Sequence, residues 1–218
     1  TCLAKEPTGS APERRPLFDL TDRPAVPNFT VQSQFSSMSH RLFVGIRPPP
    51  EIRDALIDLM EGVDDVRWQD DDQLHLTLRY IGEVDTHLAE DLALQLHAIE
   101  LPTLDLAISG TRVFVRKGRV HTLWAGVEIS PELKRLRQKI DRLCVSAGVE
   151  PDHRKYHPHI TLARVNRSSG SLEPFLERNA SLRLGPWRAD SYTLFESTLH
   201  RHGSIYEPIL IYALRTPS

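Results

Sequence analysis

The pattern of apolar and polar positions predicts strands and helices in alternation through the first half of the chain. Short apolar runs have the length of strands, and stretches with apolar side chains every three or four residues have the spacing of helices. Gly62 and Gly82 mark the expected ends of a helix and of a strand. The expected elements are a strand at 42–46, a helix at 51–60, strands at 66–68 and 74–81, a helix at 88–99 and an extended segment at 104–115.

The second half repeats this order. Ser130 and Pro131 are typical of a helix start, with a serine cap and a proline in the first turn, and Gly148 is typical of its end. Because strand–helix–strand order occurs twice, the pattern predicts an α+β, bilobal fold: two pseudo-symmetric lobes whose antiparallel-rich sheets line a central cleft, with helices outside. The further strands are expected at 122–129, 159–165, 182–184, 191–199 and 206–214, with a turn at His202-Gly203.

Residues 1–39 differ from the rest of the chain. The stretch from Pro7 to Pro27 holds five prolines, is polar and shows no sustained periodicity. Such a segment buries too little apolar surface to offset its chain entropy, so we expect a disordered tail. It also lacks the pattern of a secretory signal. Met38 has the position of a natural start, so the preceding residues are either an added leader or an extended start, and the folded domain is expected over 40–218.

Composition narrows the class of protein. With 40% hydrophobic and 26% charged residues the chain is globular in balance, and no window approaches the roughly 18 apolar residues of a membrane span. The formal net charge of −2 means that contact with a polyanion must come from a local patch. Cys2 and Cys144 are the two cysteines, too few for a disulfide framework or a cysteine zinc site. We therefore expect a cytoplasmic monomer.

Two short segments carry the candidate chemistry. Residues 74–78 read Leu-His-Leu-Thr-Leu and residues 157–162 read His-Pro-His-Ile-Thr-Leu. Because side chains alternate between the faces of a strand, His75 and Thr77 should share one face while the neighbouring leucines point to the core. His159 and Thr161 should do the same in the second lobe. Each lobe thus offers one imidazole and one hydroxyl to a shared cleft.

This set of groups suits the opening of a cyclic phosphodiester. The reaction needs a base that takes a proton from water and an acid that protonates the departing sugar oxygen, on opposite sides of the phosphorus atom. Histidine titrates near neutral pH, so one imidazole can be neutral while the other is protonated. Threonine hydroxyls can donate hydrogen bonds to the non-bridging phosphate oxygens. No metal ion is required for this chemistry.

The paired His-x-Thr-x segments resemble the two signature motifs of the two-histidine (2H) phosphoesterases. Within that superfamily the chain is most similar to the RNA 2′,3′-cyclic phosphodiesterases, also called the 2′-5′ RNA ligase family. The resemblance covers roughly residues 41–214 and leaves out the tail. It is supported by Arg-Leu-Phe-Val-Gly-Ile at 41–46, Val-Arg-Trp at 66–68, Tyr-Ile-Gly-Glu-Val at 80–84, Leu-Trp-Ala-Gly-Val at 123–127, Leu-Ala-Arg-Val at 162–165 and Leu-Phe-Glu-Ser at 194–197.

The resemblance implies a reaction and a role for each motif residue. The reaction is hydrolysis of an RNA-terminal 2′,3′-cyclic phosphate to a 2′-phosphomonoester, on RNA or a nucleotide, without cofactor or metal. His75 would be the proton donor and His159 the proton acceptor, while Thr77 and Thr161 would hold the phosphate. Related proteins also act on other cyclic or 2′-5′-linked nucleotides. A factor that joins RNA ends through a 2′-5′ bond, or binds RNA with little hydrolysis, is the alternative.

Two arginines leave alternatives open. Alternation puts Arg79 on the face of Thr77, where it could reach the phosphate or lie on the surface at the strand end. Alternation puts Arg164 on the opposite side from Thr161, so it must lie past the core or follow a bulge. The resemblance implies a substrate role for Arg164. His157, at the strand entrance, is expected to be exposed to solvent.

Basic and aromatic residues provide further candidates. Two basic clusters could steer an RNA backbone or could be solvated loops. Trp68, Tyr156 and Phe43 could stack on a base, although Trp68 and Phe43 are assigned to the core. The clusters are Arg112, Arg116, Lys117 and Arg119, and His153, Arg154 and Lys155.

Overall fold

The computed structural model describes residues 35, 38–201 and 203–215. The chain divides into a unit of residues 1–30 and a unit of residues 31–218, and all described residues belong to the second. The predicted disordered tail therefore lies outside the described residues, apart from its last positions, since the first strand already begins at Ser39. His202, in the predicted turn, also lies outside them.

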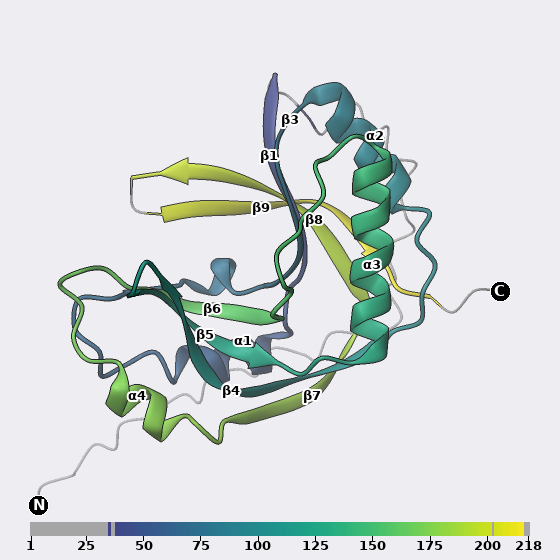
Figure 1. Ribbon diagram of the computed structural model, residues 1–218. Coiled ribbons are helices and arrows are strands. Elements are labelled where there is room, and N and C mark those ends of the chain that lie inside the picture. Colours follow the sequence, from purple (N-terminus) through teal and green to yellow (C-terminus); the bar gives the residue numbers. More distant parts are fainter. Residues whose placement is uncertain (1–34, 36–37, 202, 216–218) are drawn as a thin grey trace, which may run out of the picture. The chain divides into compact units, whose positions relative to one another are not determined.

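Nine strands form one antiparallel sheet within the described residues (Figure 1). The order across the sheet is β7-β4-β5-β6-β3-β1-β8-β9, and β2 pairs with β6. The sheet has two halves of matching order, β3-β1-β8-β9 and β6-β5-β4-β7, which meet between β3 and β6. The predicted α+β fold of two similar lobes is confirmed. The strands are β1 (Ser39–Ile46), β2 (Arg67–Trp68), β3 (Leu76–Asp85), β4 (Leu104–Arg116), β5 (Arg119–Val127), β6 (His159–Arg164), β7 (Arg183–Ala189), β8 (Ser191–His200) and β9 (Gly203–Ala213).

Two of the helices begin at a capping side chain. The Ser130 hydroxyl accepts a hydrogen bond from the Leu133 amide at 3.0 Å, and the Asp85 carboxylate accepts one from the Leu88 amide at 2.8 Å. No helix of the described residues is both long enough and apolar enough to cross a membrane. The helices are α1 (Pro50–Ile57), α2 (Thr86–Leu96), α3 (Pro131–Ser146), α4 (Glu173–Arg178) and a short 3₁₀ turn, η2 (Asp71–Gln73).

Several predicted boundaries are wrong by a few residues. Strand β3 does not end at Gly82: it continues to Asp85, because the glycine adopts a positive φ of 94° beside a register shift against β1. Helix α1 ends at Ile57, three residues before the predicted end. The segment predicted as a strand at 182–184 belongs to the longer β7, and helix α4 was not predicted from the pattern at all.

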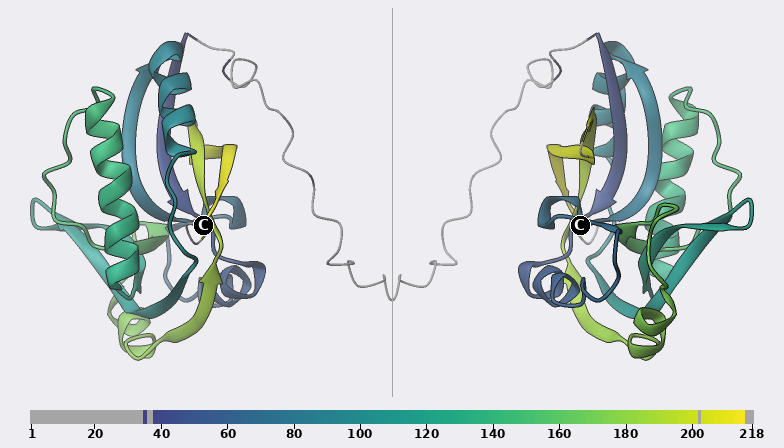
Figure 2. Two further views of the ribbon diagram at one scale, coloured as in Figure 1. Left: turned by 90° about the vertical axis from the view of Figure 1, so that its right-hand side faces the viewer. Right: turned by 90° about the vertical axis from the view of Figure 1, so that its left-hand side faces the viewer.

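Two helices pack on the lobe opposite to the one they follow in sequence. Helix α3 follows β5 but contacts β3 and α2, and it stands beside β3 in the views of Figures 1 and 2. Helix α1 follows β1 but contacts β7. The apolar face of α3, with Leu133, Leu136 and Ile140, is fully buried in this position. Each lobe therefore completes its core with a helix from the other half of the sequence.

Candidate active site

The two histidine motifs lie at the joint between the two halves of the sheet. Strand β3 meets β6 at one residue pair, Leu76 with Ile160, and both side chains are completely buried. The residues on either side of each point to the opposite face. Continuing this register by one residue brings His75 beside Thr161 and Thr77 beside His159. The pairing of β3 with β6 thus places the two motifs side by side.

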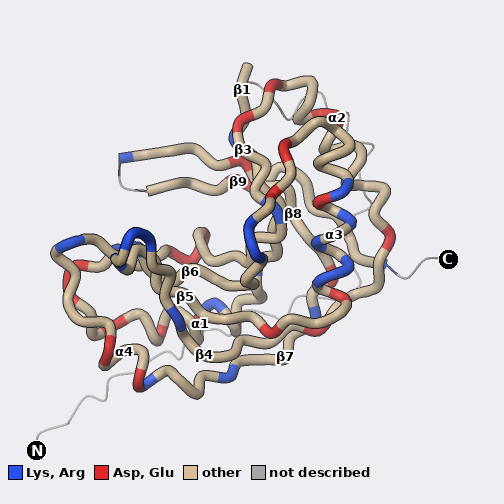
Figure 3. The backbone as a smooth tube through the Cα atoms, viewed as in Figure 1, with Lys and Arg blue, Asp and Glu red and all other residues tan. Residues whose placement is uncertain are grey.

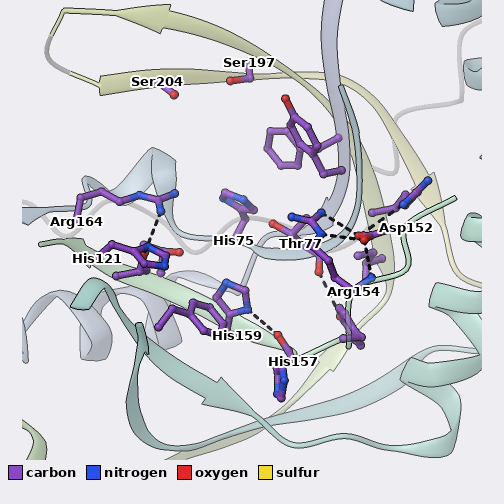
Figure 4. Close-up of a pocket in the computed structure, with 18 of the residues that line it drawn as sticks. His75, Thr77, His121, Asp152, Arg154, His157, His159, Arg164, Ser197 and Ser204 are labelled. Carbon is purple, nitrogen blue, oxygen red and sulfur yellow. Dashed lines mark hydrogen bonds and ion pairs between the residues drawn. The ribbon is translucent and has the colours of Figure 1, made fainter. Parts of the chain in front are cut away.

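Both motifs open into one cavity of about 850 Å³. Figure 4 shows the His75 and His159 rings directed into the same space, with Thr77 beside His75 and Arg164 at one side. We call this space the histidine cavity. All six candidate residues line it, namely His75, Thr77, Arg79, His159, Thr161 and Arg164.

Each imidazole is oriented by the backbone two residues before it. The His75 Nδ1 lies 2.7 Å from the Gln73 carbonyl oxygen, and the His159 Nδ1 lies 2.6 Å from the His157 carbonyl oxygen. A carbonyl oxygen only accepts hydrogen bonds, so Nδ1 is the donor in both rings. The Nε2 atoms are left for chemistry. His157 was expected to be merely exposed, but its carbonyl orients the second histidine.

Gln73 is itself held firmly by the turn before the first motif. In η2, Asp70 and Gln73 form a reciprocal capping box, with the Asp70 amide donating to the Gln73 side-chain oxygen at 3.2 Å. The Gln73 side-chain nitrogen donates to the Ser204 carbonyl oxygen of β9 at 2.6 Å. The carbonyl that orients His75 is thus fixed between η2 and the β8–β9 hairpin.

Aromatic rings surround His75 and make its charged form costly. Ring centroids of Phe43 and Tyr206 lie 4.7 Å and 5.0 Å from that of His75. Burial lowers the pKa of His75 to about 4, and the positive charges of His159 and Arg164 add to the lowering, while the Gln73 carbonyl opposes it. His75 is therefore neutral at pH 7 in the empty cavity.

His159 has a similar but less enclosed environment. The edge of its ring meets Phe114 at a centroid distance of 4.8 Å, and Trp124 lies 5.4 Å away. Burial lowers the pKa of His159, with Arg164 and His157 adding to the lowering, and the His157 carbonyl opposes it. This imidazole is neutral at pH 7 and able to accept a proton at Nε2.

A bulge follows the threonine in each motif. In β3, Thr77 pairs with Gly45 but Arg79 already pairs with Val44, so Leu78 is the extra residue. In β6, Thr161 pairs with Trp124 but Ala163 already pairs with Leu123, which makes Leu162 the extra residue. Each bulge reverses the alternation beyond it. Arg164 thereby returns to the cavity side, which is the bulge alternative given by the sequence.

Beyond the bulge of β3, the Arg79 guanidinium is held by two carboxylates. Arg79 is only 3% exposed and forms ion pairs with Asp141 of α3 at 3.2 Å and with Asp152 at 3.6 Å. It also donates to the Glu150 carbonyl oxygen. The alternative of an exposed strand end is therefore wrong, and Arg79 lines the histidine cavity with its guanidinium already engaged by two carboxylates. Arg79 ties β3 to α3 and to the loop before β6.

That loop brings Tyr156 against the first motif. The Tyr156 hydroxyl donates to the Thr77 carbonyl oxygen at 3.2 Å, and the Arg137 guanidinium carbon lies 4.6 Å from the centroid of its ring. Burial raises the pKa of the Tyr156 phenol, so it stays protonated at neutral pH. Tyr156 thus lines the histidine cavity and supports the backbone of the first motif.

The other sequence candidates divide between wall and core. Phe43 is buried and also forms cavity wall beside His75. Trp68 instead packs on Phe175, with ring centroids 5.7 Å apart. Arg112 lies over Trp124, with its guanidinium carbon 5.6 Å from the ring centroid. Lining residues that the sequence pattern did not indicate are Tyr80, Phe114, His121, Thr122, Ser197, Ser204 and Tyr206.

A cavity with two facing imidazoles, two threonine hydroxyls and an arginine is equipped for acid–base chemistry on a phosphate ester. The described residues contain no group of three or more His, Cys, Asp or Glu side chains placed to hold a metal ion. An antiparallel α+β fold with one His-x-Thr pair in each lobe defines the class of two-histidine phosphoesterases.

Comparison with known proteins gives the family. The model of the LigT-like phosphoesterase family matches residues 46–124 and 126–206, and the chain belongs to this family. An RNA 2′,3′-cyclic phosphodiesterase of Aeropyrum pernix is 32% identical over 143 residues, which are 64% of this chain and 81% of that protein. The protein of the same name from Escherichia coli K12 is 28% identical over 182 residues, which are 82% and 98% of the two chains.

Solved structures show the same fold. A crystal structure of E. coli LigT complexed with 3′-AMP has a TM-score of 0.65 and 27% sequence identity, and the match covers 81% of this chain and 98% of that chain. A structure described as a phosphoesterase has a TM-score of 0.66 at 26% identity, with 81% and 99% covered.

Proposed function

We propose that the protein hydrolyses RNA-terminal 2′,3′-cyclic phosphates to 2′-phosphomonoesters, with His75 as the acid and His159 as the base. The observation that carries the proposal is the matched pair of imidazoles, each bound through Nδ1 to a backbone carbonyl and each facing the histidine cavity. Relatives across most of the chain are named RNA 2′,3′-cyclic phosphodiesterases, which supports this substrate class.

The proton transfers balance with these two groups alone. His159 Nε2 takes a proton from water as the water oxygen forms a bond to phosphorus. The bond between phosphorus and the 3′ oxygen breaks on the opposite side, and His75 Nε2 donates its proton to that oxygen. The products are a 3′ hydroxyl and a 2′-phosphomonoester. A proton exchange with solvent then restores both histidines.

The remaining polar groups would bind the phosphate. The hydroxyls of Thr77 and Thr161 can each donate to a non-bridging oxygen, and Arg164 adds a positive charge at the rim. Arg79 is proposed here as a positioning residue, because its guanidinium already pairs with Asp141 and Asp152.

The low pKa of His75 is compatible with an acid role once substrate is bound. A cyclic phosphate carries one negative charge, and an anion beside an imidazole favours its protonated form. The bound substrate therefore supplies the negative charge that raises the pKa of His75. His159, on the water side, has only to remain neutral until the attack begins.

The first experiment follows adenosine 2′,3′-cyclic phosphate by phosphorus NMR, because the 2′- and 3′-phosphate products have different resonances. We expect the 2′ isomer. His75→Ala and His159→Ala should each lower the rate by about 10²–10⁴-fold. Leu199→Ala, at an exposed position of β8, is the matched control and should keep the wild-type rate. Near-full activity in both histidine variants would overturn the mechanism.

Metal independence is tested separately. Imidazoles and hydroxyls supply every proton and hydrogen bond in the proposed steps, so the rate should be unchanged by EDTA after dialysis. A loss of rate that Mg²⁺, Mn²⁺ or Zn²⁺ restores would contradict this part of the proposal. Measurable affinity for RNA with no turnover of any cyclic phosphate would favour the alternative of an RNA-binding factor.

A further inference from the structure

A second cavity adjoins the histidine cavity. It has a volume of about 710 Å³, and its wall includes Arg119, Arg167, Asn166 and Ser169. His121 lines both cavities, so they are neighbours across this one side chain. We call the second space the arginine cavity. The reaction on the cyclic phosphate makes no use of it.

A chain of polar contacts runs from the reaction site towards the arginine cavity. The Arg164 guanidinium donates to the Thr122 hydroxyl at 3.1 Å, and this hydroxyl lies 2.8 Å from His121 Nδ1. Arg119 lines the arginine cavity together with His121, and both side chains are exposed. The polar contacts therefore lead from Arg164 to His121, which borders the space that Arg119 lines.

The end of the β4–β5 hairpin presents arginines to both spaces. Arg116 of β4 pairs with Arg119 of β5 across the hairpin. Arg116 lines the histidine cavity and Arg119 lines the arginine cavity. In Figure 3 the basic segments of this hairpin end and of the loop after β6 lie on the same side of the molecule. The hairpin thus offers positive charge along the boundary between the cavities.

The loop that carries Arg167 is well held. The Asn166 side-chain oxygen accepts from the Ser168 amide at 2.8 Å, while the Asn166 side-chain nitrogen and the Ser169 hydroxyl donate to the Asp65 carbonyl oxygen at 3.0 Å and 2.8 Å. This order keeps Arg167 beside the cavity at a reduced entropy cost for binding.

The two sides of the histidine cavity differ in charge compensation. In Figure 4, Asp152 and Arg154 lie on the side opposite to Arg164 and His121. Arg154 there is bound to Asp152 through two contacts, at 2.8 Å and 2.9 Å. By contrast, the described residues that line the arginine cavity include no carboxylate, and neither Arg119 nor Arg167 pairs with a carboxylate of the described residues. A polyanion therefore gains more electrostatic binding energy beside the arginine cavity than beside Arg154.

We propose that the arginine cavity binds the phosphates of the nucleotides that precede the cyclic terminus, so the preferred substrate is an RNA 3′ end and not a free nucleotide. This inference rests on the proposed function for the position of the cyclic phosphate. Arg119 and Arg167 are the phosphate contacts. They read charge and not sequence, because phosphate contacts carry no base information.

The test measures binding without requiring turnover. Fluorescence anisotropy measures the affinity for a fluorescent five-nucleotide RNA that ends in a 2′-phosphate, over a range of salt concentrations. Competition against this RNA gives the affinity for adenosine 2′-monophosphate. For Arg119→Gln/Arg167→Gln we expect about tenfold weaker RNA binding and a log–log salt slope reduced by about 1.4, at roughly 0.7 for each phosphate contact on a single strand. Binding of the mononucleotide should change by less than about twofold.

Kinetics and two controls separate the possible outcomes. The double variant should lose the advantage in kcat/KM of a pentanucleotide cyclic phosphate over adenosine 2′,3′-cyclic phosphate. Arg188→Gln, exposed on β7, should leave RNA affinity unchanged. Lys155→Gln tests the opposite side of the histidine cavity. Loss of RNA affinity in Lys155→Gln but not in the double variant would overturn the proposal, as would equal losses for RNA and mononucleotide. Absence of turnover with the anisotropy result intact would refute only the proposed reaction.

Discussion

The two histidines are oriented by neutral carbonyl oxygens, and the absence of charge on these partners affects the pKa of both rings. A carboxylate beside Nδ1 would favour the imidazolium strongly, whereas a carbonyl favours it weakly. Burial among aromatic rings therefore dominates at His75 and lowers its pKa to about 4. The imidazole of His75 is thus uncharged in the free protein and becomes protonated beside the anionic substrate. The acid is thus formed mainly in the complex.

The same pKa makes stability depend on pH. The pKa of His75 is about 4 in the folded protein against about 6.5 for an ordinary histidine, so the unfolded chain binds more protons between these values. The free energy of unfolding therefore rises with pH through this window and falls on acidification. We expect wild type to lose on the order of 1 kcal/mol more than His75→Gln between pH 6.5 and 4, since the ring is partly exposed. Urea denaturation at each pH measures this, and equal losses would contradict the buried neutral histidine.

Arg79 should matter far more for stability than the neighbouring Arg154. Arg79→Met would remove a cation that is 3% exposed, leaving Asp141 unpaired among the described residues and Asp152 with Arg154 alone. Breaking a buried pair in this way costs about 3–5 kcal/mol. The Arg154 side chain is 76% exposed, and Arg154→Met should cost at most about 1 kcal/mol. Urea unfolding of both variants tests the ranking, and similar losses would show that the Arg79 contacts are not a buried network.

At the scale of strands, alternation predicted the cavity side chains only as far as each threonine. His75, Thr77, His159 and Thr161 could be placed from sequence because a strand of period two links each pair. The bulges at Leu78 and Leu162 could not be predicted from sequence, because a leucine at a bulge has the same pattern as a leucine of the core. Hence alternation does not predict that Arg79 is buried in ion pairs, and it leaves Arg164 with two possible faces. The wall residues of β4 and β9 depend on sheet pairing, which a local pattern does not contain.

The close approach of β1 to β3 gives a test at this scale. A Cβ added at Gly45 would lie 2.9 Å from the Leu76 carbonyl oxygen and 3.6 Å from the His75 ring. Gly45→Ala must therefore push the two strands apart where the first histidine is held. We expect a loss of about 1–3 kcal/mol in unfolding free energy, with a lower kcat for the folded enzyme. Chemical denaturation and initial rates measure the two effects. Leu199→Ala is the control, and wild-type kcat in Gly45→Ala would show that the spacing is not critical.

For the whole molecule, the exchange of helices decides whether the lobes are independent. Sequence order predicts that each helix covers its own lobe, since most consecutive elements are neighbours. Instead α3 packs on β3, and α1 contacts β7. Neither lobe can complete its core without the other, so the histidines on β3 and β6 keep their spacing only when both are folded. A pair of separately stable lobes could not fix a reaction geometry so closely.

This interdependence predicts a single unfolding transition. The three tryptophans lie on β2, β5 and β7, all in the half of the sheet that contains β6. Tryptophan fluorescence therefore reports that half, while far-UV circular dichroism reports every helix and strand. With shared cores, the two probes should give the same urea midpoint and slope within error. Leu136→Ala in α3 removes a completely buried side chain and should lower both midpoints together, by about 2–5 kcal/mol in unfolding free energy. A fluorescence transition left unchanged by Leu136→Ala would mean that the half of the sheet with β6 folds alone, and the helix exchange would then not hold the site together.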